Sequence, residues 1–290
     1  MRLATVKVGG GGEIAAVVLE DGVASLGAIN DLLNASWPTD LLSLLEEGRV
    51  GDLRSWLRGL GEVAREELAE VVIPFDRVEY APLYRRPRKI WGIGLNYVEP
   101  AGDLSETAPS EEPASFMRPD TTIIGPGEEI LLPEQSERVT GEAELGLIIG
   151  REARNLSEKD APSVVAGLTT ILDMTAEDIL RRNPRYLTRA KSFDTFFSFG
   201  PQLLTLEEAG EIPDLKVATV LNGEVQRVNA VSNMTFSPWS LVSFHSKVMT
   251  LLPGDIISTG TPGAVQIREG DVLSCRIDGF EPLSNPVSKG

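Results

Sequence analysis

The stretch GEAELGLIIG, Gly141–Gly150, places two glutamates one residue apart in front of an apolar run. In a β-strand successive side chains point to opposite faces, so Glu142 and Glu144 would project from one face with Cβ atoms about 7 Å apart. The residues that follow them are apolar on both alternating sets, which predicts a strand covered on both faces. Two carboxylates at the start of such a strand repel each other and lose hydration when they are buried. The pair therefore needs a partner that compensates its negative charge.

A third acidic candidate is Asp173 in LTTILDMTAEDIL, where an apolar strand is followed by a helix. We expect Glu142, Glu144 and Asp173 to meet at one edge of a sheet. Three carboxylates with no cysteine or histidine nearby favour a hard cation, Mg²⁺, Mn²⁺ or Ca²⁺, over zinc. Spacing alone leaves a second interpretation open, because Glu-x-Glu pairs are also common on strands that face solvent.

The composition limits the class of protein and its partners. An apolar content of 42% and a charged content of 24% over 290 residues are typical of a globular chain with a sizeable core. The formal net charge of −16 argues against nucleic acid as a partner and makes a multivalent cation a natural ligand. The single cysteine, Cys275, excludes an intrachain disulfide, and its place in the alternating run VLSCRI predicts a small buried side chain.

The chain carries no sequence signal for secretion or for a membrane. The apolar stretch in MRLATVKVGG is too short and too interrupted for a signal peptide. No run of about 18 apolar residues occurs, so we expect no membrane partner. These features predict a cytoplasmic location.

The first part of the chain is expected to form a small α/β domain, residues 1–80. Its short strands begin at Arg2–Val8, and Gly9–Gly12 is interpreted as a hairpin turn, because a phosphate loop would need a helix after it. A helix is predicted to begin at Thr39-Asp40 and to stop at Gly48, and a second one is predicted within Asp52–Val71.

Residues 81–290 are expected to form a second, larger domain, which contains the acidic candidates. Strand-like runs recur from KIWGIGL to VLSCRI, with turns such as Pro253–Asp255 between them. Helices are predicted only near Ser157–Val164, Ala176–Arg182 and Pro238–Leu251. The pattern therefore indicates an α+β fold rather than a regular βαβ repeat.

Between Lys89 and Val287 the sequence resembles the fumarylacetoacetate hydrolase superfamily, in its branch of 2-hydroxyhepta-2,4-diene-1,7-dioate isomerases and oxaloacetate decarboxylases. The motifs that carry the resemblance occur in the family's order: GIGLNY (92–97), IIGPGEEILLP (123–133), GEAELGLIIG (141–150), LDMTAEDI (172–179), AKSFDTF (190–196), MTLLPGDIISTGTPGAV (249–265) and GDVLSCRIDGFEPLSNPV (270–287). The resemblance implies a mixed β-sandwich roll with a small N-terminal α/β domain, and a homodimer. It also implies a divalent metal, Mg²⁺ or Mn²⁺, whose three carboxylate ligands map onto Glu142, Glu144 and Asp173.

The resemblance further implies a small-molecule substrate, a 2-oxo or 2,4-dioxo carboxylate. A metal in this site would act as a Lewis acid on the keto oxygen of a chelated oxo acid and would stabilise an enolate. Such stabilisation serves tautomerisation, decarboxylation and C–C cleavage alike.

Five further residues match positions that the family uses. Lys191 in RAKSFDTF matches the lysine beside the metal, which implies a catalytic role in holding the enolate or moving a proton. Thr261 in STGTPG matches a substrate-contacting threonine, and Asn96 and Tyr97 border the family's pocket. Arg118 stands where relatives often have lysine and is expected to bind an anionic substrate group. Without the motifs, Lys191 would be interpreted as a surface residue and STGTPG as a plain turn.

The sequence also departs from the family pattern. Hydrolytic members carry a histidine after GLNY, in a pattern like GLNYxxHAxE, whereas GLNYVEPAGDL has Pro100 at the histidine position and Asp103 at that of the acid. Glu177 and Leu180 replace a frequent arginine and a frequent glutamine. The single histidine, His245, lies in a predicted helix and is interpreted as a packing or hydrogen-bonding residue.

Three hypotheses about function follow. The first is a metal-dependent isomerase or decarboxylase of a small 2-oxo or enol carboxylate, which needs the metal, a proton donor and a binding site. The second is a C–C hydrolase of a 2,4-dioxo acid, in which Glu99 or Asp103 would have to activate water. The third is a non-catalytic member that binds metal and oxo acid, and Lys191 with the complete carboxylate set weighs against it.

Overall fold

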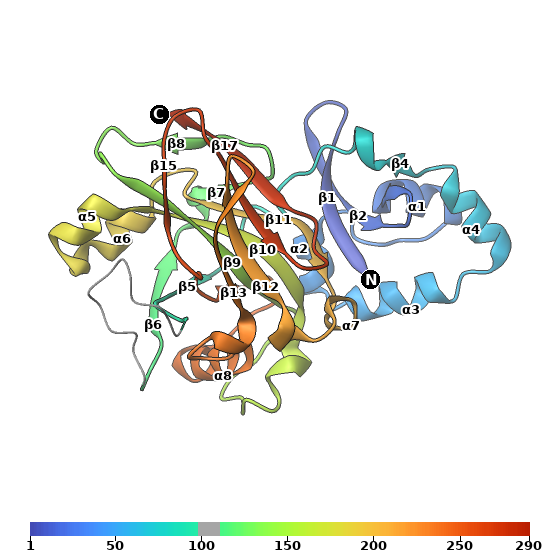
Figure 1. Ribbon diagram of the computed structural model, residues 1–290. Coiled ribbons are helices and arrows are strands. Elements are labelled where there is room, and N and C mark those ends of the chain that lie inside the picture. Colours follow the sequence, from blue (N-terminus) through green and yellow to red (C-terminus); the bar gives the residue numbers. More distant parts are fainter. Residues whose placement is uncertain (98–110) are drawn as a thin grey trace.

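The central elements of the fold are long antiparallel strands, described in a computed structural model that covers residues 1–97 and 111–290 (Figure 1). The strands are β1 (Arg2–Val8), β2 (Gly12–Val18), β3 (Gly22–Ser25), β4 (Ile73–Pro74), β5 (Ile90–Gly94), β6 (Ala114–Arg118), β7 (Ile123–Ile124), β8 (Ile130–Leu132), β9 (Val139–Ile149), β10 (Val165–Ala176), β11 (Phe197–Leu204), β12 (Lys216–Leu221), β13 (Glu224–Ala230), β14 (Ile256–Ser258), β15 (Val265–Ile267), β16 (Val272–Ile277) and β17 (Leu283–Lys289).

Helices account for fewer of the described residues than strands do. The α-helices are α1 (Leu26–Leu33), α2 (Leu41–Glu46), α3 (Val50–Arg58), α4 (Glu62–Ala69), α5 (Glu177–Arg182), α6 (Leu187–Lys191), α7 (Leu206–Ala209) and α8 (Pro238–Val248). Short 3₁₀ helices span Phe75–Arg77, Asp120–Thr122, Ala161–Val164, Pro184–Tyr186, Ile212–Asp214 and Val231–Asn233. The α+β fold that the sequence predicts is confirmed.

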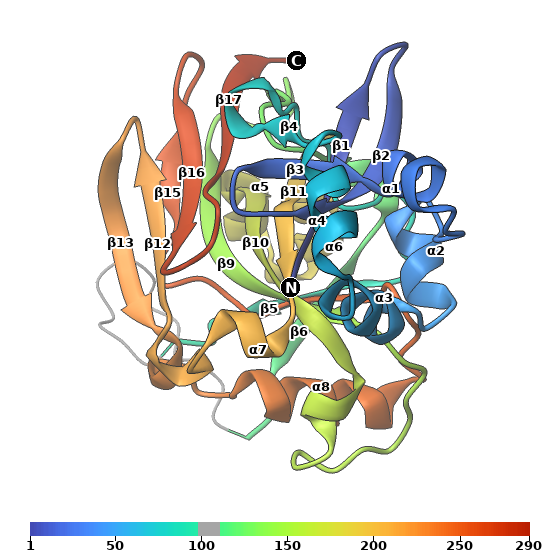
Figure 2. The ribbon, with the colours of Figure 1, turned by 90° about the vertical axis from the view of Figure 1, so that its right-hand side faces the viewer.

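The strands of the described residues form two sheets. The larger one follows the order β4-β3-β2-β1-β11-β10-β9-β14-β5-β6, with β15 also paired to β9 and β7 to β11. The smaller one follows the order β13-β12-β16-β17-β8. Figure 2 shows the smaller sheet on one side of β9 and β10 and the helices α1 to α4 on the other.

Strand β9 separates two hydrophobic cores, as its apolar run predicts. Leu145, Leu147 and Ile149 are fully buried in the core that the two sheets share. Ile148 is fully buried in the other core, which includes the N-terminal helices. Burying one such side chain contributes about 1.5–3 kcal/mol, so both faces of the strand anchor it.

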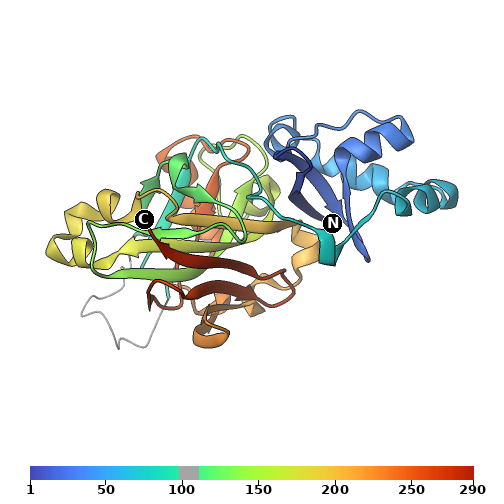
Figure 3. The same cartoon turned by 90° about the horizontal axis from the view of Figure 1, so that it is seen from above.

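The N-terminal part of the chain extends the larger sheet. Strand β1 pairs with β11 from Arg2↔Leu204 to Ala4↔Gln202, and β2, β3 and β4 follow outward. Leu26 of α1 and Leu41 of α2 pack in the same core as Phe197 of β11. Figure 3 shows these elements beside the rest of the sheet. The division into residues 1–80 and 81–290 stays a prediction. Both parts contribute strands to the larger sheet and side chains to the core that includes the N-terminal helices.

Several local predictions are confirmed. The glycine run joins β1 to β2 in an antiparallel hairpin, with Val8 opposite Gly12. Helix α2 begins after Asp40, whose carboxylate accepts a hydrogen bond from Ser43 N at 2.8 Å, a typical N-cap. Cys275 is fully buried in β16.

Two predicted helices are wrong in extent, and three α-helices of the described residues, α1, α6 and α7, were not predicted. The helix expected within Asp52–Val71 is two helices, α3 and α4, because the chain turns at Leu60–Gly61 and Gly61 is the N-cap residue of α4. The helix expected near Ser157–Val164 is a turn followed by a 3₁₀ segment that contains Pro162, which has no N–H to donate. Helix α1 starts directly after β3, where Ser25 caps it by accepting from Ala28 N at 3.2 Å.

None of the helices within residues 1–97 and 111–290 combines the length and the apolar character that crossing a bilayer requires.

Candidate active site

Three carboxylates gather on one face of the larger sheet. Glu142 and Glu144 project from β9, and Asp173 of β10 is the cross-strand partner of Glu142. One oxygen of each carboxylate can be chosen so that all three lie within 4.8 Å of one another. Alternation along β9 thus does place the two glutamates on one side, and antiparallel pairing with β10 adds the aspartate.

The expected position at a sheet edge is wrong. Strand β10 continues three residues beyond Asp173, to Ala176, and β9 lies between β10 and β14 inside the sheet. The strand does not end after LTTILD, because Met174, Thr175 and Ala176 continue the antiparallel pairing with β9. The carboxylates therefore lie on the sheet's face, part-way along two interior strands.

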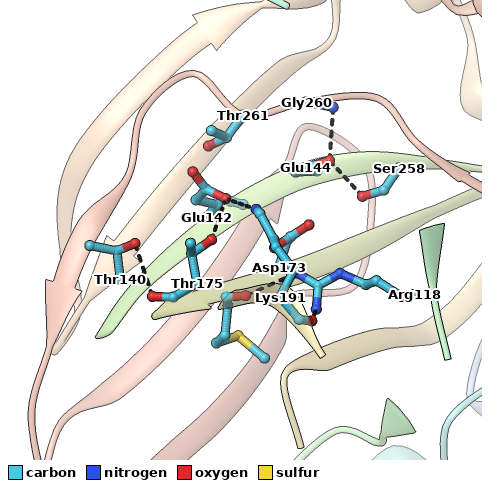
Figure 4. A network of polar contacts seen from close by, with 12 residues as sticks. Arg118, Thr140, Glu142, Glu144, Asp173, Thr175, Lys191, Ser258, Gly260 and Thr261 are labelled. Atoms are coloured by element: carbon cyan, nitrogen blue, oxygen red, sulfur yellow. Dashed lines mark hydrogen bonds and ion pairs between the residues drawn. The ribbon is translucent and has the colours of Figure 1, made fainter. Parts of the chain in front are cut away.

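The turn after β14 closes around Glu144. Strands β14 and β15 pair with β9 on either side of this glutamate and leave a gap between them. Into this gap Ser258 Oγ donates to Glu144 Oε2 at 2.5 Å and Gly260 N donates to the same oxygen at 2.8 Å (Figure 4). Gly260 has φ of +96°, and a Cβ there would lie 2.8 Å from Asn96 Cβ, so the turn requires glycine.

Lys191, the last residue of α6, lies among these carboxylates. Its Nζ is 2.7 Å from Glu142 Oε2 and 2.7 Å from Asp173 Oδ1, and the residue is 6% exposed. Burial by itself would lower the pKa of Lys191, but the charges of Asp173 and Glu142 outweigh it and raise the pKa above its ordinary value. Lys191 is therefore an ammonium ion in the described arrangement.

The carboxylate cluster has the properties of a site for a hard divalent cation. Burial, followed by the charges of Asp173 and Glu142, raises the pKa of Glu144 to about 8. Asp173 Oδ2 is buried and has no hydrogen-bond partner among the described residues. A cation held by Glu142, Glu144 and Asp173 would remove this repulsion and satisfy the open oxygen, and an all-oxygen donor set suits Mg²⁺ or Mn²⁺.

The comparison with protein families agrees with this site. The model of the C-terminal region of fumarylacetoacetate hydrolase matches residues 89–288. The chain belongs to the fumarylacetoacetate hydrolase family. It is 32% identical over 277 residues to oxaloacetate tautomerase FAHD2A, mitochondrial, of Homo sapiens, and the alignment covers 92% of this chain and 84% of that protein.

Solved structures of the fumarylacetoacetate hydrolase family share the fold over the whole chain. A 5-carboxymethyl-2-hydroxymuconate delta-isomerase from Mycobacterium smegmatis matches with a TM-score of 0.76 and 28% identity, covering 100% of this chain and 99% of its own. Maleylpyruvate hydrolase from Sphingobium sp. SYK-6, solved with manganese(II) and pyruvate, matches with a TM-score of 0.77 and 28% identity, covering 100% of both chains. The relatives are thus enzymes with different reactions, namely tautomerisation, isomerisation and hydrolysis.

The family-based assignment of Arg118 to an anionic substrate group stays a prediction. The structure places Arg118 beside the carboxylates, where its guanidinium forms an ion pair with Asp173 and donates to Met174 O at 2.9 Å. The exposed fraction of its side chain is 0%, so the guanidinium is enclosed by protein.

The other expected substrate contacts also border the site. The amide of Asn96 is fully used, because Nδ2 donates to Phe236 O at 3.0 Å and Thr259 O at 2.7 Å, while Oδ1 accepts from Phe236 N at 2.9 Å. Asn96 therefore connects the segments that contain Phe236 and Thr259 by hydrogen bonds beside the carboxylate cluster. Thr261 Oγ1 accepts from Gly263 N at 3.1 Å within its own turn.

Tyr97 contributes a buried hydroxyl near Glu144. The residue is 8% exposed, and its hydroxyl has no hydrogen-bond partner among the described residues. Burial, followed by the charge of Glu144, raises the pKa of Tyr97 well above its ordinary value. Its hydroxyl is therefore a neutral donor, and substrate contact by Asn96, Tyr97 and Thr261 stays a prediction.

Two residues of this network were not expected from the sequence. Ser258 donates to Glu144, and Thr175 Oγ1 donates to Glu142 Oε2 at 3.4 Å. Thr175 lies two residues after Asp173 on the same side of β10, and Ser258 lies three residues before Thr261, so each is close to a residue that the sequence did single out. The alternation of side chains along each strand was the available signal. Only the pairing of β10 and β14 with β9 shows that these two hydroxyl groups face Glu142 and Glu144.

Two of the positions that depart from the family pattern, Glu177 and Leu180, belong to α5. Glu177 begins this helix and forms ion pairs with Arg138 and, at 2.9 Å, with Arg181. Leu180 is partly buried and packs against the core that the two sheets share. Pro100 and Asp103, together with the candidate base Glu99, lie outside the described residues.

His245 is a core residue, as predicted. It is fully buried in α8, its Nδ1 lies 2.7 Å from Leu241 O, and its ring centroid is 4.6 Å from that of Trp91. Burial lowers the pKa of His245 below its ordinary value, opposed by the hydrogen bond to Leu241. The imidazole is therefore neutral, with its Nδ1–H assigned as donor to the helix carbonyl.

We expect His245 to make stability depend on pH in acid. Its folded-state pKa lies below that of the unfolded chain, so its contribution is complete above about pH 6.5 and is lost as pH falls through the folded-state pKa. The difference in free energy of unfolding between the unmodified protein and His245→Phe should shrink by up to about 1.4 kcal/mol per pH unit in that window. Denaturant unfolding at several pH values measures it. Because the chain has one histidine, its NMR titration is unambiguous, and a midpoint above pH 6.5 would contradict the buried neutral state.

Proposed function

We propose that this protein is a divalent-metal-dependent enzyme that isomerises (tautomerises) or decarboxylates a small 2-oxo or enol carboxylate through an enolate. The observation that carries the choice of reaction is the place of the only histidine, His245, which is buried in α8 against Trp91. A histidine base that could activate water for C–C hydrolysis is therefore not provided by this chain. The likeness to a human oxaloacetate tautomerase over 92% of the chain supports the same choice.

Glu142, Glu144 and Asp173 would hold the metal, Mg²⁺ or Mn²⁺. When bound, the metal would supply Lewis acidity to the 2-oxo group of the substrate and neutralise the three carboxylates. Ser258 and Gly260 keep Glu144 turned toward the cluster by donating to the same carboxylate oxygen. Orientation of each carboxylate by such contacts reduces the reorganisation that ligand binding requires.

Lys191 is the residue that we assign to proton transfer. Its ammonium lies within hydrogen-bond distance of Glu142 and Asp173, so it borders any ligand held by these carboxylates. In ketonisation the ammonium gives a proton to the enol carbon, and the proton of the enol oxygen restores it. The reverse order produces the enol, and the neutral hydroxyl of Tyr97 is available as a donor to a substrate oxygen.

Hydrolysis of a 2,4-dioxo acid is the second candidate. The observation in its favour is the match to maleylpyruvate hydrolase over the whole chain. Glu99 or Asp103 would then have to serve as the base that deprotonates water. A positioned base accounts for ~10²–10⁴-fold in rate, so its identity decides between the two reactions.

A side-by-side assay tests the proposal. Protein loaded with Mn²⁺ or Mg²⁺ is expected to accelerate enol–keto exchange or decarboxylation of oxaloacetate, and chelator should abolish the acceleration. Acylpyruvates should be cleaved slowly or not at all. Metal without protein is the necessary control, because free divalent ions also act on oxaloacetate. Efficient, chelator-sensitive cleavage of acylpyruvate would instead establish the hydrolase.

A further inference from the structure

Arg118 makes an unusual connection across the larger sheet. It ends β6, and along the sheet order the strands β5, β14 and β9 separate β6 from β10. Nevertheless its guanidinium forms an ion pair with Asp173 of β10 (Figure 4). The sheet must therefore curl, so that its edge strand approaches the face that carries the carboxylates.

The two terminal nitrogens of the guanidinium donate to acceptors within the protein, whereas Nε is buried and has no hydrogen-bond partner among the described residues. Nη2 donates to Asp173 Oδ1 and, at 2.9 Å, to Met174 O, and Nη1 donates to the main-chain carbonyl of Lys191. The rings of Phe116 and Phe197 lie 5.6 and 5.8 Å from the guanidinium carbon. With its side chain fully buried, Arg118 has no surface left for a substrate in this arrangement.

These contacts connect Arg118 to Asp173 and to Lys191, the carboxylate and the amine on which the proposed chemistry depends. Asp173 Oδ1 accepts from both Arg118 and Lys191, which leaves Oδ2 of the same carboxylate without a partner among the described residues. The bond to Lys191 O fixes the end of α6, from which Lys191 Nζ reaches the cluster. A planar guanidinium can hold these acceptors at once, whereas an ammonium has no such rigid fork.

We propose that Arg118 is a positioning residue. It orients Asp173 so that Oδ2 faces the ligand, and it holds the end of α6 so that Lys191 Nζ reaches the same ligand. The inference rests on the proposed function of the carboxylates and Lys191. It differs from the expectation that Arg118 binds an anionic group of the substrate. Loss of a positioning residue lowers kcat, the rate of the substrate complex, whereas loss of a substrate contact raises KM.

The test compares Arg118→Met, Arg118→Lys and a control, Arg138→Met. Arg138 is also an arginine with an ion pair to a carboxylate, that of Glu177 in α5, and within the described residues it has no hydrogen bond or ion pair to the side chain of Asp173 or Lys191. Loss of an orienting partner typically costs 10–100-fold, so Arg118→Met should lower kcat about 100-fold with KM within about 3-fold, and Arg118→Lys about 10-fold. Calorimetry should show Mn²⁺ affinity reduced at least about 10-fold in Arg118→Met, and the control should leave kcat, KM and Mn²⁺ affinity unchanged.

The opposite pattern would overturn the inference. A KM raised more than about 10-fold at constant kcat would identify Arg118 as a substrate contact, and unchanged kcat and Mn²⁺ affinity would give it no role at the site. If Arg118→Met does not fold, Arg118→Lys with its fold checked by circular dichroism decides by the same split of kcat and KM. If the unmodified protein turns over neither oxaloacetate nor acylpyruvate, the proposed function fails separately, and Mn²⁺ calorimetry on the variants still decides the role of Arg118.

Discussion

Replacing Lys191 by methionine is expected to lower turnover of the 2-oxo acid by ~10²-fold or more, because the variant loses both a proton donor and a positive charge at the site. Methionine keeps the length and apolar stem of the side chain, so α6 and its packing should be retained. The ammonium that now contacts Glu142 and Asp173 would be gone. Steady-state kinetics with saturating Mn²⁺ measures the effect.

The matched control for this substitution is Lys89→Met. Lys89 also forms an ion pair with a fully buried carboxylate, with Nζ 2.7 Å from Asp255 Oδ2, and neither residue belongs to the carboxylate cluster. Breaking a buried pair typically costs about 3–5 kcal/mol, so Lys89→Met should reduce stability. Its turnover per folded molecule should remain that of the unmodified protein. Full activity in Lys191→Met would return Lys191 to a structural role.

Replacing Glu144 by glutamine is expected to weaken Mg²⁺ and Mn²⁺ binding at least about tenfold, because one anionic ligand is lost. The amide oxygen can still accept from Ser258 Oγ and Gly260 N, so the turn after β14 should keep its conformation. Without metal and near neutral pH the variant should be more stable than the unmodified protein, because folding no longer has to protonate, or bury as a charge, a carboxyl group whose pKa rises to about 8. The same substitution thus has opposite effects on metal affinity and on metal-free stability.

Calorimetric titration with Mn²⁺ and thermal unfolding with and without Mn²⁺ measure both effects. Glu128→Gln is the control, because Glu128 is an ion-paired glutamate, 2.9 Å from Arg85, that belongs to no metal cluster of the described residues. Saturating Mn²⁺ should raise the unfolding temperature of the unmodified protein and of Glu128→Gln more than that of Glu144→Gln. Unchanged Mn²⁺ affinity in Glu144→Gln would refute the assignment of this residue as a ligand.

Local signals in the sequence account for the parts of the fold that were predicted. Alternation in GEAELGLIIG predicts β9, its burial on both faces and the common direction of Glu142 and Glu144, because each depends only on the period of a strand. The N-cap Asp40 and the turn glycines likewise act over a few residues. The N-cap Ser25 followed the same rule and was missed, because β3 and α1 join without a loop.

Features that join distant segments needed the three-dimensional arrangement. The sheet-edge prediction was wrong because the length of β10 is set by its pairing with β9, which extends the strand beyond Asp173. Ser258 and Arg118 lie 114 and 55 positions from the carboxylates that they contact, Glu144 and Asp173. No periodicity in either segment encodes such a contact.

The sequence by itself determined the strand that carries the two glutamates, the family and the set of residues able to bind a hard cation, since residue type, alternation and motif order are properties of short segments. Only the tertiary structure decided that Asp173 lies opposite Glu142, that the ammonium of Lys191 contacts both of these carboxylates, and that Arg118 is enclosed rather than open to a ligand. The physical reason is that strand register and the curl of the sheet arise from packing both cores at once, and neither is a local property of the chain.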